Sequence, residues 1–465
     1  MESLPFVNRC AGAAQPARER PVVVLAGLLC AAALSLTAAR HAAAAQPPAA
    51  LEEVAGPAGG QPTPVERLIA EALAHNAELA AARAGAEGAQ QRIVAAGSLE
   101  DPLLEVGLVN APLPSLSLRR EDMTMKMLGL TQKLPYPGKR SLREAVAAAD
   151  ATSLALAVDE TANRVARDVR VAYEELRLAD TTERLLLRSR ATLEELASIA
   201  NSRYAVGHAA QSDVLRAQAQ VVQMRQELLR VGQQKLVRAI ELQRLLGRHE
   251  AGPAIVPAAA ALAPLRADAA TLVREAAERR PRLRALDALV TKGDSELELA
   301  RREYYPDFDL RLGYGQRERA LDGMPRDDMI TMTLAVNLPL WRRSRLEPRV
   351  AEARSMRREA SALAQAQRSE AQASLGQQLA LERQSRLSAD LYRTTLLPQL
   401  HAVVESALNA YRVGRVDFLT LLDAQLREYE AARGAAEAIA SHNEAIAEID
   451  LLTGAVPGTP EGAMP

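Results

Sequence analysis

The chain has 465 residues, enough for one large domain or two to three ordinary ones. Its 57 Lys and Arg residues nearly balance 58 Asp and Glu residues, and the formal net charge of -1 argues against a nucleic-acid-binding protein. Aromatic residues make up only 3% of the chain, whereas Ala, Leu, Arg, Glu and Gln are abundant. This composition favours a mainly helical protein.

The N-terminus has the features of an export signal. An arginine-containing segment precedes an apolar run at residues 21–39, and four consecutive alanines follow. We therefore predict a signal peptide at residues 1–45 and a disordered, Ala-, Pro- and Gly-rich lead-in at 46–64. An N-terminal membrane anchor and lipidation of Cys30 are the alternatives. Cleavage near residue 45 leaves no cysteine in the mature chain.

The rest of the chain is one unit written twice. A shift of 204 residues superimposes Leu134-Pro135 on Leu338-Pro339. After a three-residue gap, a shift of 207 superimposes Tyr204-Ala-Val-Gly207 on Tyr411-Arg-Val-Gly414. Several such matches in the same order indicate a duplication. The predicted segments are a first repeat at 65–250, a Pro-rich linker at 251–265, a second repeat at 266–455 and a disordered tail at 456–465.

Each repeat is predicted to contain a helix, two strands, a very long helix and a return helix. The helix of the first repeat covers 65–97 without interruption. Apolar residues alternate with polar or small ones in the strands, so that one face of each strand is apolar. The strands are about as long as the tilted strands that cross a bilayer, although a soluble hairpin with one buried face is the alternative. The predicted strands lie at 99–109, 123–134, 308–314 and 330–338.

The long helices are too long for a compact globular domain. The first runs from about residue 139 to Tyr204, and about 65 residues of α-helix extend on the order of 100 Å. The second runs to Tyr411, with Pro348 in its early turns and Pro398 further on. Apolar residues of the first return helix follow a heptad spacing typical of coiled coils. These residues are Val214, Ala217, Val221, Met224, Leu228, Val231, Leu242 and Leu245.

Basic residues gather where the strands lead into the long helices. Positive charge near a helix N-terminus opposes the helix dipole, so another partner must compensate. Outer-membrane lipid phosphates would serve, and a solvated basic patch is the alternative. The residues are Lys139, Arg140, Arg143, Arg342, Arg343 and Arg345.

Four strands cannot close a barrel, and an open sheet edge leaves backbone groups unsatisfied in lipid. The smallest bacterial barrels have eight strands, so two copies would supply eight strands and three would supply twelve. The chain is therefore predicted to oligomerise, and geometry alone does not choose between these numbers.

The order of elements is similar to that of TolC-like outer membrane efflux proteins over about residues 65–455. The similarity includes Tyr305-Pro-Asp307, Asn337-Leu-Pro-Leu340 and the segment from Tyr411 to Gln425, Tyr-Arg-Val-Gly-Arg-Val-Asp-Phe-Leu-Thr-Leu-Leu-Asp-Ala-Gln. The resemblance implies a homotrimer with a 12-stranded outer-membrane β-barrel and a periplasmic α-helical barrel. It also implies a periplasmic membrane-fusion adaptor, an inner-membrane pump, no cofactor and no catalysis. The sequence Leu134-Pro-Tyr-Pro-Gly-Lys-Arg140 resembles the heavy-metal branch, which serves cobalt-zinc-cadmium or copper-silver resistance.

The resemblance also implies roles for individual residues. The turns after the long helices contact the adaptor in this family. Of two aspartates that ring the closed entrance, the later one matches Asp423, whereas Thr420 stands at the earlier position and Val416 replaces the arginine of the tip. A ring of Asp423 would attract cations, although a solvated helix carboxylate is the alternative. The expected adaptor-contacting tips are Tyr204, Val206, Gly207, Tyr411, Val413 and Gly414, and the barrel–helix junctions are Pro135, Pro137 and Pro339.

The sequence contains neither a phosphate-binding Gly loop nor a hydrolase or metalloprotease motif, so we expect no enzyme and no metal site. Its histidines lack ligand spacing. Met123, Met125 and Met127 suit Cu(I) chemically, but alternate positions of a strand more often face lipid or the pore. We predict a passive export duct for heavy-metal cations. The alternatives are multidrug efflux or type I protein secretion through the same fold, and a periplasmic coiled-coil scaffold without a channel.

Overall fold

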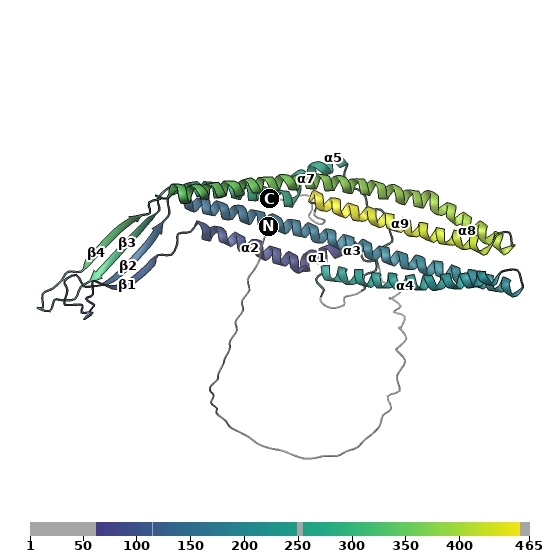
Figure 1. Cartoon of the computed structure of the whole chain (residues 1–465), viewed down its shortest axis with the longest axis horizontal. Coiled ribbons are helices and arrows are strands. Elements are labelled where there is room, and N and C mark those ends of the chain that lie inside the picture. The colour runs from purple at the N-terminus through teal and green to yellow at the C-terminus, as the bar shows by residue number, and fades with distance from the viewer. Residues whose placement is uncertain (1–61, 114, 249–253, 456–465) are drawn as a thin grey trace, which may run out of the picture. The chain divides into compact units, whose positions relative to one another are not determined.

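The computed structural model describes residues 62–113, 115–248 and 254–455 (Figure 1). All of them belong to one unit, Gly60–Pro465. The predicted signal peptide, most of the lead-in, residues 251–253 of the linker and the tail 456–465 lie outside the described residues. The fold class is confirmed, because long helices dominate and a single antiparallel sheet of four strands accompanies them.

The order of helices and strands is as predicted in both repeats, although some of the predicted helices are divided. The first repeat comprises α1 (Val65–His75), α2 (Ala77–Gly97), β1 (Leu103–Val109), β2 (Met125–Leu134), α3 (Lys139–Ala205) and α4 (Gln211–Leu245). The second comprises α5 (Ala269–Arg279), α6 (Pro281–Arg302), β3 (Phe308–Gln316), β4 (Met329–Val336), the π-helical turn η1 (Arg342–Leu346), α7 (Glu347–Leu391), the π-helical turn η2 (Tyr392–Leu396), α8 (Leu397–Arg412) and α9 (Phe418–Thr453).

The four strands form one antiparallel sheet in the order β1-β2-β3-β4. β1 and β4 are its edges, and neither has a further strand partner within the part of the chain that the structure describes. Figure 1 shows the sheet at one end of the long helices, whereas the α3–α4 and α8–α9 turns lie at the opposite end. The loop 110–124 connects β1 to β2, and the loop 317–328 connects β3 to β4, both at the end of the sheet away from the long helices. An ion pair between Arg326 and Asp122 joins the two loops.

The strand register places apolar residues on one face across all four strands. Leu104, Leu130, Leu312 and Met332 lie in one cross-strand row. The next row on this face contains Val106, Leu128, Tyr314 and Ile330. These side chains are exposed. The opposite face carries mainly Thr, Gly, Met and charged residues, so the predicted division into an apolar and a polar face is confirmed.

The helix predicted at 65–97 is wrong as a single element, because Asn76 divides it into α1 and α2. The Asn76 side-chain oxygen accepts hydrogen bonds from the N–H groups of Glu78 and Leu79, at 2.9 and 3.2 Å, and thereby caps α2. Its side-chain amide donates to the Leu245 carbonyl at 3.0 Å. A tertiary hydrogen bond thus fixes the break in a segment whose other residues favour helix.

The second long helix is also interrupted. α3 has 67 residues without a break, whereas its counterpart consists of α7, η2 and α8. Pro348 and Pro398 each lie two residues after a π-helical turn, near the start of α7 and α8. Proline lacks the N–H that the interior of an α-helix needs. Pro348 lies in the first turn of α7, where that N–H has no α-helical partner, whereas Pro398 follows the π-helical turn that divides α7 from α8.

The helices pack side by side through narrow apolar seams. α3 contacts α2, α4, α6 and α9, while α7 contacts α6 and α9. The predicted heptad of α4 is confirmed, because Leu228 is partly buried and the other seven residues are buried. Near the α3–α4 and α8–α9 turns the heptad residues from Val214 to Val231 share a core with Leu193, Phe418 and Leu421, each at most 1% exposed, whereas Leu242 and Leu245 belong to a second core with α1 and α3. Burial of each large apolar side chain contributes about 2 kcal/mol.

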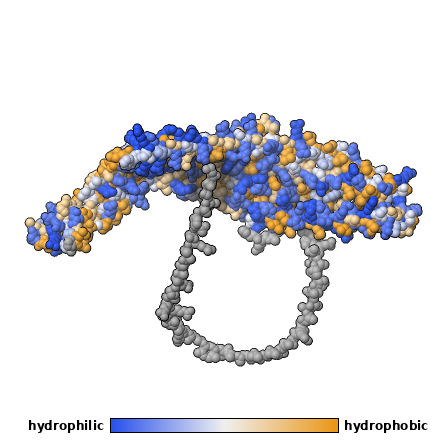
Figure 2. All heavy atoms as spheres, viewed as in Figure 1, coloured by the Kyte–Doolittle hydropathy of each residue, from blue (hydrophilic) through white to orange (hydrophobic). Residues whose placement is uncertain are grey.

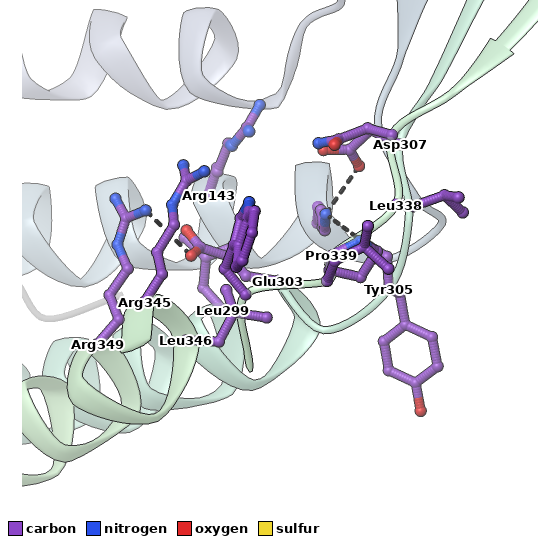
Figure 3. Close-up of a pocket in the computed structure, with 14 residues that line it drawn as sticks. Arg143, Leu299, Glu303, Tyr305, Asp307, Leu338, Pro339, Arg345, Leu346 and Arg349 are labelled. Carbon is purple, nitrogen blue, oxygen red and sulfur yellow. Dashed lines mark hydrogen bonds and ion pairs between the residues drawn. The ribbon is translucent and has the colours of Figure 1, made fainter. Parts of the chain in front are cut away.

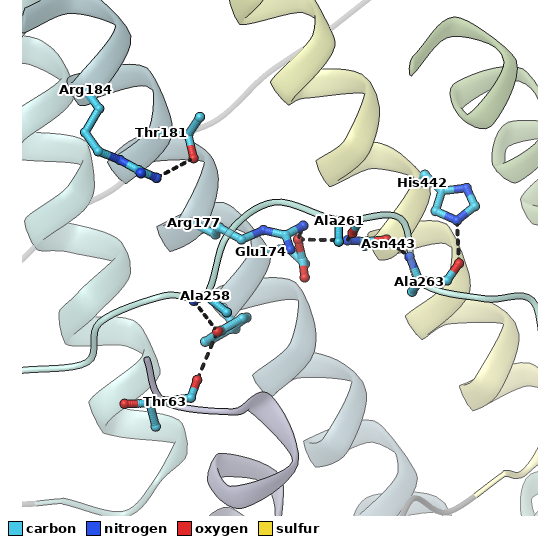
Figure 4. A network of polar contacts seen from close by, with 11 residues as sticks. Thr63, Glu174, Arg177, Thr181, Arg184, Ala258, Ala261, Ala263, His442 and Asn443 are labelled. Carbon is cyan, nitrogen blue, oxygen red and sulfur yellow. Dashed lines mark hydrogen bonds and ion pairs between the residues drawn. The ribbon is translucent and has the colours of Figure 1, made fainter. Parts of the chain in front are cut away.

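The linker between the repeats is fastened to α3 and α9 by buried polar groups (Figure 4). The Tyr173 hydroxyl donates to the Thr63 carbonyl at 3.0 Å and accepts from the Ala258 N–H at 2.8 Å. Asn443 accepts from the Ala263 N–H at 2.8 Å, and the neighbouring His442 lies 2.8 Å from the Ala263 carbonyl. These contacts give His442 a structural role.

None of the described helices combines the length and the apolar character that a membrane-crossing helix requires. Among residues 62–113, 115–248 and 254–455, no group of three or more His, Cys, Asp and Glu side chains is arranged to hold a metal ion.

Candidate functional site

Three regions contain the residues that the sequence singles out. The first is the strand-to-helix junction, where β2 enters α3 and β4 enters η1 and α7. The second is the tip, formed by the α3–α4 and α8–α9 turns. The third is the first turns of α9, which begin at the tip and carry Thr420 and Asp423.

At the junction, a buried lysine ties the two repeats together. The Lys139 ammonium lies 2.8 Å from the Asp307 carboxylate and donates to the Tyr305 carbonyl at 2.9 Å. The same Asp307 oxygen accepts from the Tyr136 N–H at 2.8 Å. The Tyr136 and Tyr305 rings stack with their centroids 4.6 Å apart. These contacts fix the direction in which each strand continues into its helix.

The predicted junction prolines occupy this region. Pro135 and Pro137 lie between β2 and α3, and Pro339 lies between β4 and η1. The Pro137 carbonyl accepts from the Arg302 guanidinium at 3.1 Å. Pro339 lines a cavity of about 330 Å³ in which Arg143, Arg345 and Arg349 gather on the side that holds Glu303, with Asp307 on the other side (Figure 3). In Figure 2, hydrophilic residues gather over the start of α7 next to the sheet.

The tip is built around an arginine that sequence reasoning missed. The Arg203 guanidinium donates to the Tyr411 carbonyl and to the His208 carbonyl, the latter at 3.3 Å. It also lies over the Tyr411 ring, 4.7 Å from its centroid. Arg203 and Tyr411 are 208 residues apart in sequence, and no local pattern marks their contact.

The predicted tip residues divide into exposed and packed ones. Tyr204, Val206 and Val413 have exposed side chains. Tyr411 is only 2% exposed and packs edge-on against Phe418, with ring centroids 5.7 Å apart. Gly207 and Gly414 have φ angles of 76° and 77°, a left-handed conformation that ends each long helix. Tyr411 therefore packs in the core behind the turn, whereas Tyr204, Val206 and Val413 form the exposed surface of the tip.

The predicted entrance residues lie on successive turns of α9. The Thr420 N–H donates to the Asp417 carboxylate at 3.1 Å, so Thr420 belongs to the N-terminal cap of the helix. Hydrogen bonds from Thr420 lower the pKa of Asp417. Asp423 is exposed and pairs with Arg427 at 2.8 Å. Within the single chain, the charge of Asp423 is therefore partly neutralised by its neighbour one turn away.

The comparisons with known proteins agree with this architecture. The family model described as outer membrane efflux protein matches residues 68–248 and 272–455. The chain belongs to the outer membrane efflux protein family. This match confirms the family membership predicted from the sequence.

Solved structures of channels show the same fold. The outer-membrane channel OprN is 18% identical, with a TM-score of 0.72 over 84% of this chain and 89% of that one. The CmeC outer membrane channel of Campylobacter jejuni is 16% identical, with a TM-score of 0.72 over 84% and 86%. CusC, described as forming a transmembrane channel, is 14% identical, with a TM-score of 0.70 over 84% and 91%. No curated protein matches the chain.

Proposed function

We propose that this efflux protein is the outer-membrane channel of a tripartite efflux system and works as a passive duct. The observation that carries the proposal is the sheet, which has one apolar and one polar face across its four strands. Its strands lead into long helices, of which α3 is about 100 Å long. A sheet with one apolar and one polar face is what a barrel needs between lipid and a water-filled pore. Energy for export comes from an inner-membrane pump.

The open edges of the sheet support a homotrimer in the outer membrane. β1 and β4 each leave a row of backbone groups that a neighbouring copy can pair. Three copies contribute twelve strands, the number implied by the resemblance to TolC-like proteins. Pairing of β4 with β1 of the next copy closes the barrel without any exposed edge.

The helices offer a matching contact surface. An exposed apolar stripe runs along α4 at a strict spacing of seven residues and lies beside the buried heptad. It consists of Leu215, Val222, Leu229 and Leu236. Exposed heptad stripes pack against a further helix in coiled coils. We assign this stripe to the contact between neighbouring copies, which would close the helical barrel below the sheet.

The tip is the proposed docking site for the periplasmic membrane-fusion adaptor. Tyr204, Val206 and Val413 supply exposed apolar surface at the turns that lie farthest from the sheet. Gly207 and Gly414 set the shape of these turns, and Tyr411 holds the second turn in place. Asp423, one to two turns from the tip, is the proposed cation-selective element of the entrance, with Thr420 beside it.

Heavy-metal cations are the proposed cargo. The support is the sequence from Leu134 to Arg140, which resembles the heavy-metal branch and forms the junction between β2 and α3. Multidrug efflux and type I protein secretion are the competing cargoes of the same fold, and neighbouring genes discriminate the latter. A periplasmic scaffold without a channel is the third alternative, and a soluble periplasmic monomer with no β signal would favour it.

Susceptibility of a clean deletion strain tests the cargo. The strain is compared with its complemented parent on copper, silver, zinc, cobalt, cadmium and a panel of drugs and detergents. Sensitivity confined to one or two metals is the expected result and would identify the cargo. Broad drug sensitivity with normal metal tolerance would contradict the heavy-metal proposal and favour a multidrug duct.

A further inference from the structure

We infer that the cavity at the strand-to-helix junction binds the phosphate group of an anionic phospholipid whose acyl chains lie along the apolar face of the sheet. The inference rests on the proposed position of the sheet in the outer membrane. It names a ligand for a cavity that the export of cargo does not require.

The cavity has an excess of positive charge. Two of its cations are matched, because Lys139 pairs with Asp307 at 2.8 Å and Arg349 pairs with Glu303 at 3.1 Å. Arg143 and Arg345 also line the cavity, and across residues 62–113, 115–248 and 254–455 neither lies within ion-pair distance of a carboxylate. The junction thus presents two guanidinium groups without a matching anion.

An anion with several acceptor oxygens fits these groups. Guanidinium groups bind phosphate oxygens in pairs, with charge-assisted hydrogen bonds that are stronger than neutral ones. Arg143 lies in the first turns of α3, and Arg345 precedes α7 in η1. The unpaired N–H groups of a helix N-terminus favour negative charge at the same place. A phosphate would therefore relieve the repulsion between the arginines and the helix dipoles.

Apolar side chains also line the cavity. Leu338, Leu340 and Trp341 line it, and the side chain of Trp341 is 71% exposed. Leu338 follows Val336 by two residues and so continues the apolar row of β4 beyond the end of the strand. Tryptophan is enriched where a membrane meets water. Cations beside apolar side chains suit an amphiphilic ligand, whereas a free anion would contact only the cations.

A unique fluorophore makes the inference testable in the whole protein. Trp341 is the only tryptophan among the 465 residues. The full-length channel is reconstituted into vesicles that contain phosphatidylcholine and phosphatidylglycerol, with bromine atoms on the acyl chains of one lipid at a time. Bromine quenches tryptophan only at close range, so the quenching reports which lipid lies beside Trp341.

The expected result is a preference for phosphatidylglycerol. At equal mole fractions, brominated phosphatidylglycerol should occupy the site about 25-fold more than brominated phosphatidylcholine, the ratio expected for two lipid–arginine contacts near a membrane surface. The Arg143→Gln/Arg345→Gln variant should lose this preference, and Arg143→Lys/Arg345→Lys should keep most of it. Arg343→Gln is the matched control, because Arg343 lies in η1 between Arg342 and Ser344 but does not line the cavity.

Several outcomes would overturn the inference. Equal quenching by the two lipids in the unmodified protein would show that the cavity does not select anionic lipid. An equal loss in the Arg343→Gln control would indicate a diffuse basic surface. Loss of the preference on addition of excess inorganic phosphate would assign the cavity to a free anion. If the arginine variants keep the full preference, the two arginines do not bind the lipid, as expected if salt bridges from a neighbouring copy occupy them.

The same vesicles separate this inference from the proposed function. If they conduct ions while the lipids quench equally, the channel stands and the lipid site fails. If they do not conduct and neither lipid quenches Trp341, the sheet is not in the membrane, and both fail.

Discussion

Burial gives one carboxylate a pH dependence that a mutation can reveal. Glu444 on α9 lines a cavity between α3, α4 and α9 together with Glu175 and Arg238. Loss of contact with water, and then repulsion by Glu175 and Glu174, raises its pKa from 4.5 to about 7, while Arg238 acts in the opposite direction. Between these two pH values the folded protein binds more protons than the unfolded one, so the free energy of unfolding falls as pH rises.

The Glu444→Gln variant is therefore expected to be more stable than the parent above pH 7, and to differ little near pH 4.5. Part of the side chain remains in contact with water, which limits the gain to about 1 kcal/mol. Thermal unfolding of the detergent-solubilised protein as a function of pH measures the effect. Glu437→Gln, an exposed position in the same cavity, is the control and should leave the pH slope unchanged. A parallel shift at all pH values would refute the assignment to Glu444.

At the proposed entrance, charge should set ion selectivity in a predictable direction. Asp423→Ala removes a carboxylate and should lower the preference for cations, whereas Arg427→Ala releases Asp423 from its ion pair and should raise it. Reversal potentials across a lipid bilayer under a salt gradient measure both variants. If neither changes the reversal potential, Asp423 is a solvated helix carboxylate without a role in the pore.

At the scale of elements, the tip turns depend on left-handed backbone geometry. Gly207 has a φ of 76°, and no atom beyond the glycine and its two chain neighbours lies within 4 Å of the position that a Cβ would occupy, so any cost of Gly207→Ala comes from the backbone conformation. We expect a loss of about 1 kcal/mol, seen as faster amide hydrogen exchange at the α3–α4 turn. Gly232→Ala, within α4 and equally uncrowded, should instead stabilise the protein slightly. Equal effects of the two substitutions would contradict this account of the turn.

The elements could be predicted because their periodicity is strong. The alternation of apolar and polar residues predicts all four strands to within a few residues of their ends, and the heptad spacing predicts which residues of α4 are buried. The divisions inside helices could not be predicted, since Asn76 ends α1 through a hydrogen bond to Leu245, which is 169 residues away in sequence. The sequence shows Pro348 and Pro398 within the second long helix, but it does not predict the π-helical turns that precede them, because these depend on how the whole helix packs.

The candidate site was predictable only in part. Glycine at the tip and proline at the junctions carry local signals, which is why these turns were found from the sequence. The contacts that hold them, between Arg203 and Tyr411 and between Lys139 and Asp307, join the two repeats across 208 and 168 residues. Such contacts leave no local pattern, and they decide that Tyr411 is packed whereas Tyr204 is exposed.

At the scale of the whole molecule, assembly should depend on the exposed stripe of α4. Leu229, at 72% exposed, lies in the middle of the stripe, and Leu229→Asp would place one carboxylate in each of the three interfaces of the trimer. We expect the variant to lose the trimer, measured by the mass of the detergent-solubilised particle with light scattering. Gln223→Asp adds the same charge at an exposed position about 100° around the helix from the stripe, and should leave the trimer intact. Loss of the trimer in both variants, or in neither, would contradict the assigned interface.

The central claim is that the chain forms a channel through the outer membrane. Single-channel recording of the purified full-length protein in a planar lipid bilayer tests it most directly. The account predicts discrete current steps of uniform size, with a weak cation preference that the Asp423→Ala variant reduces. A folded full-length protein that stays a soluble monomer, gives no β signal and produces no current steps would contradict it, and would leave the periplasmic scaffold as the better description.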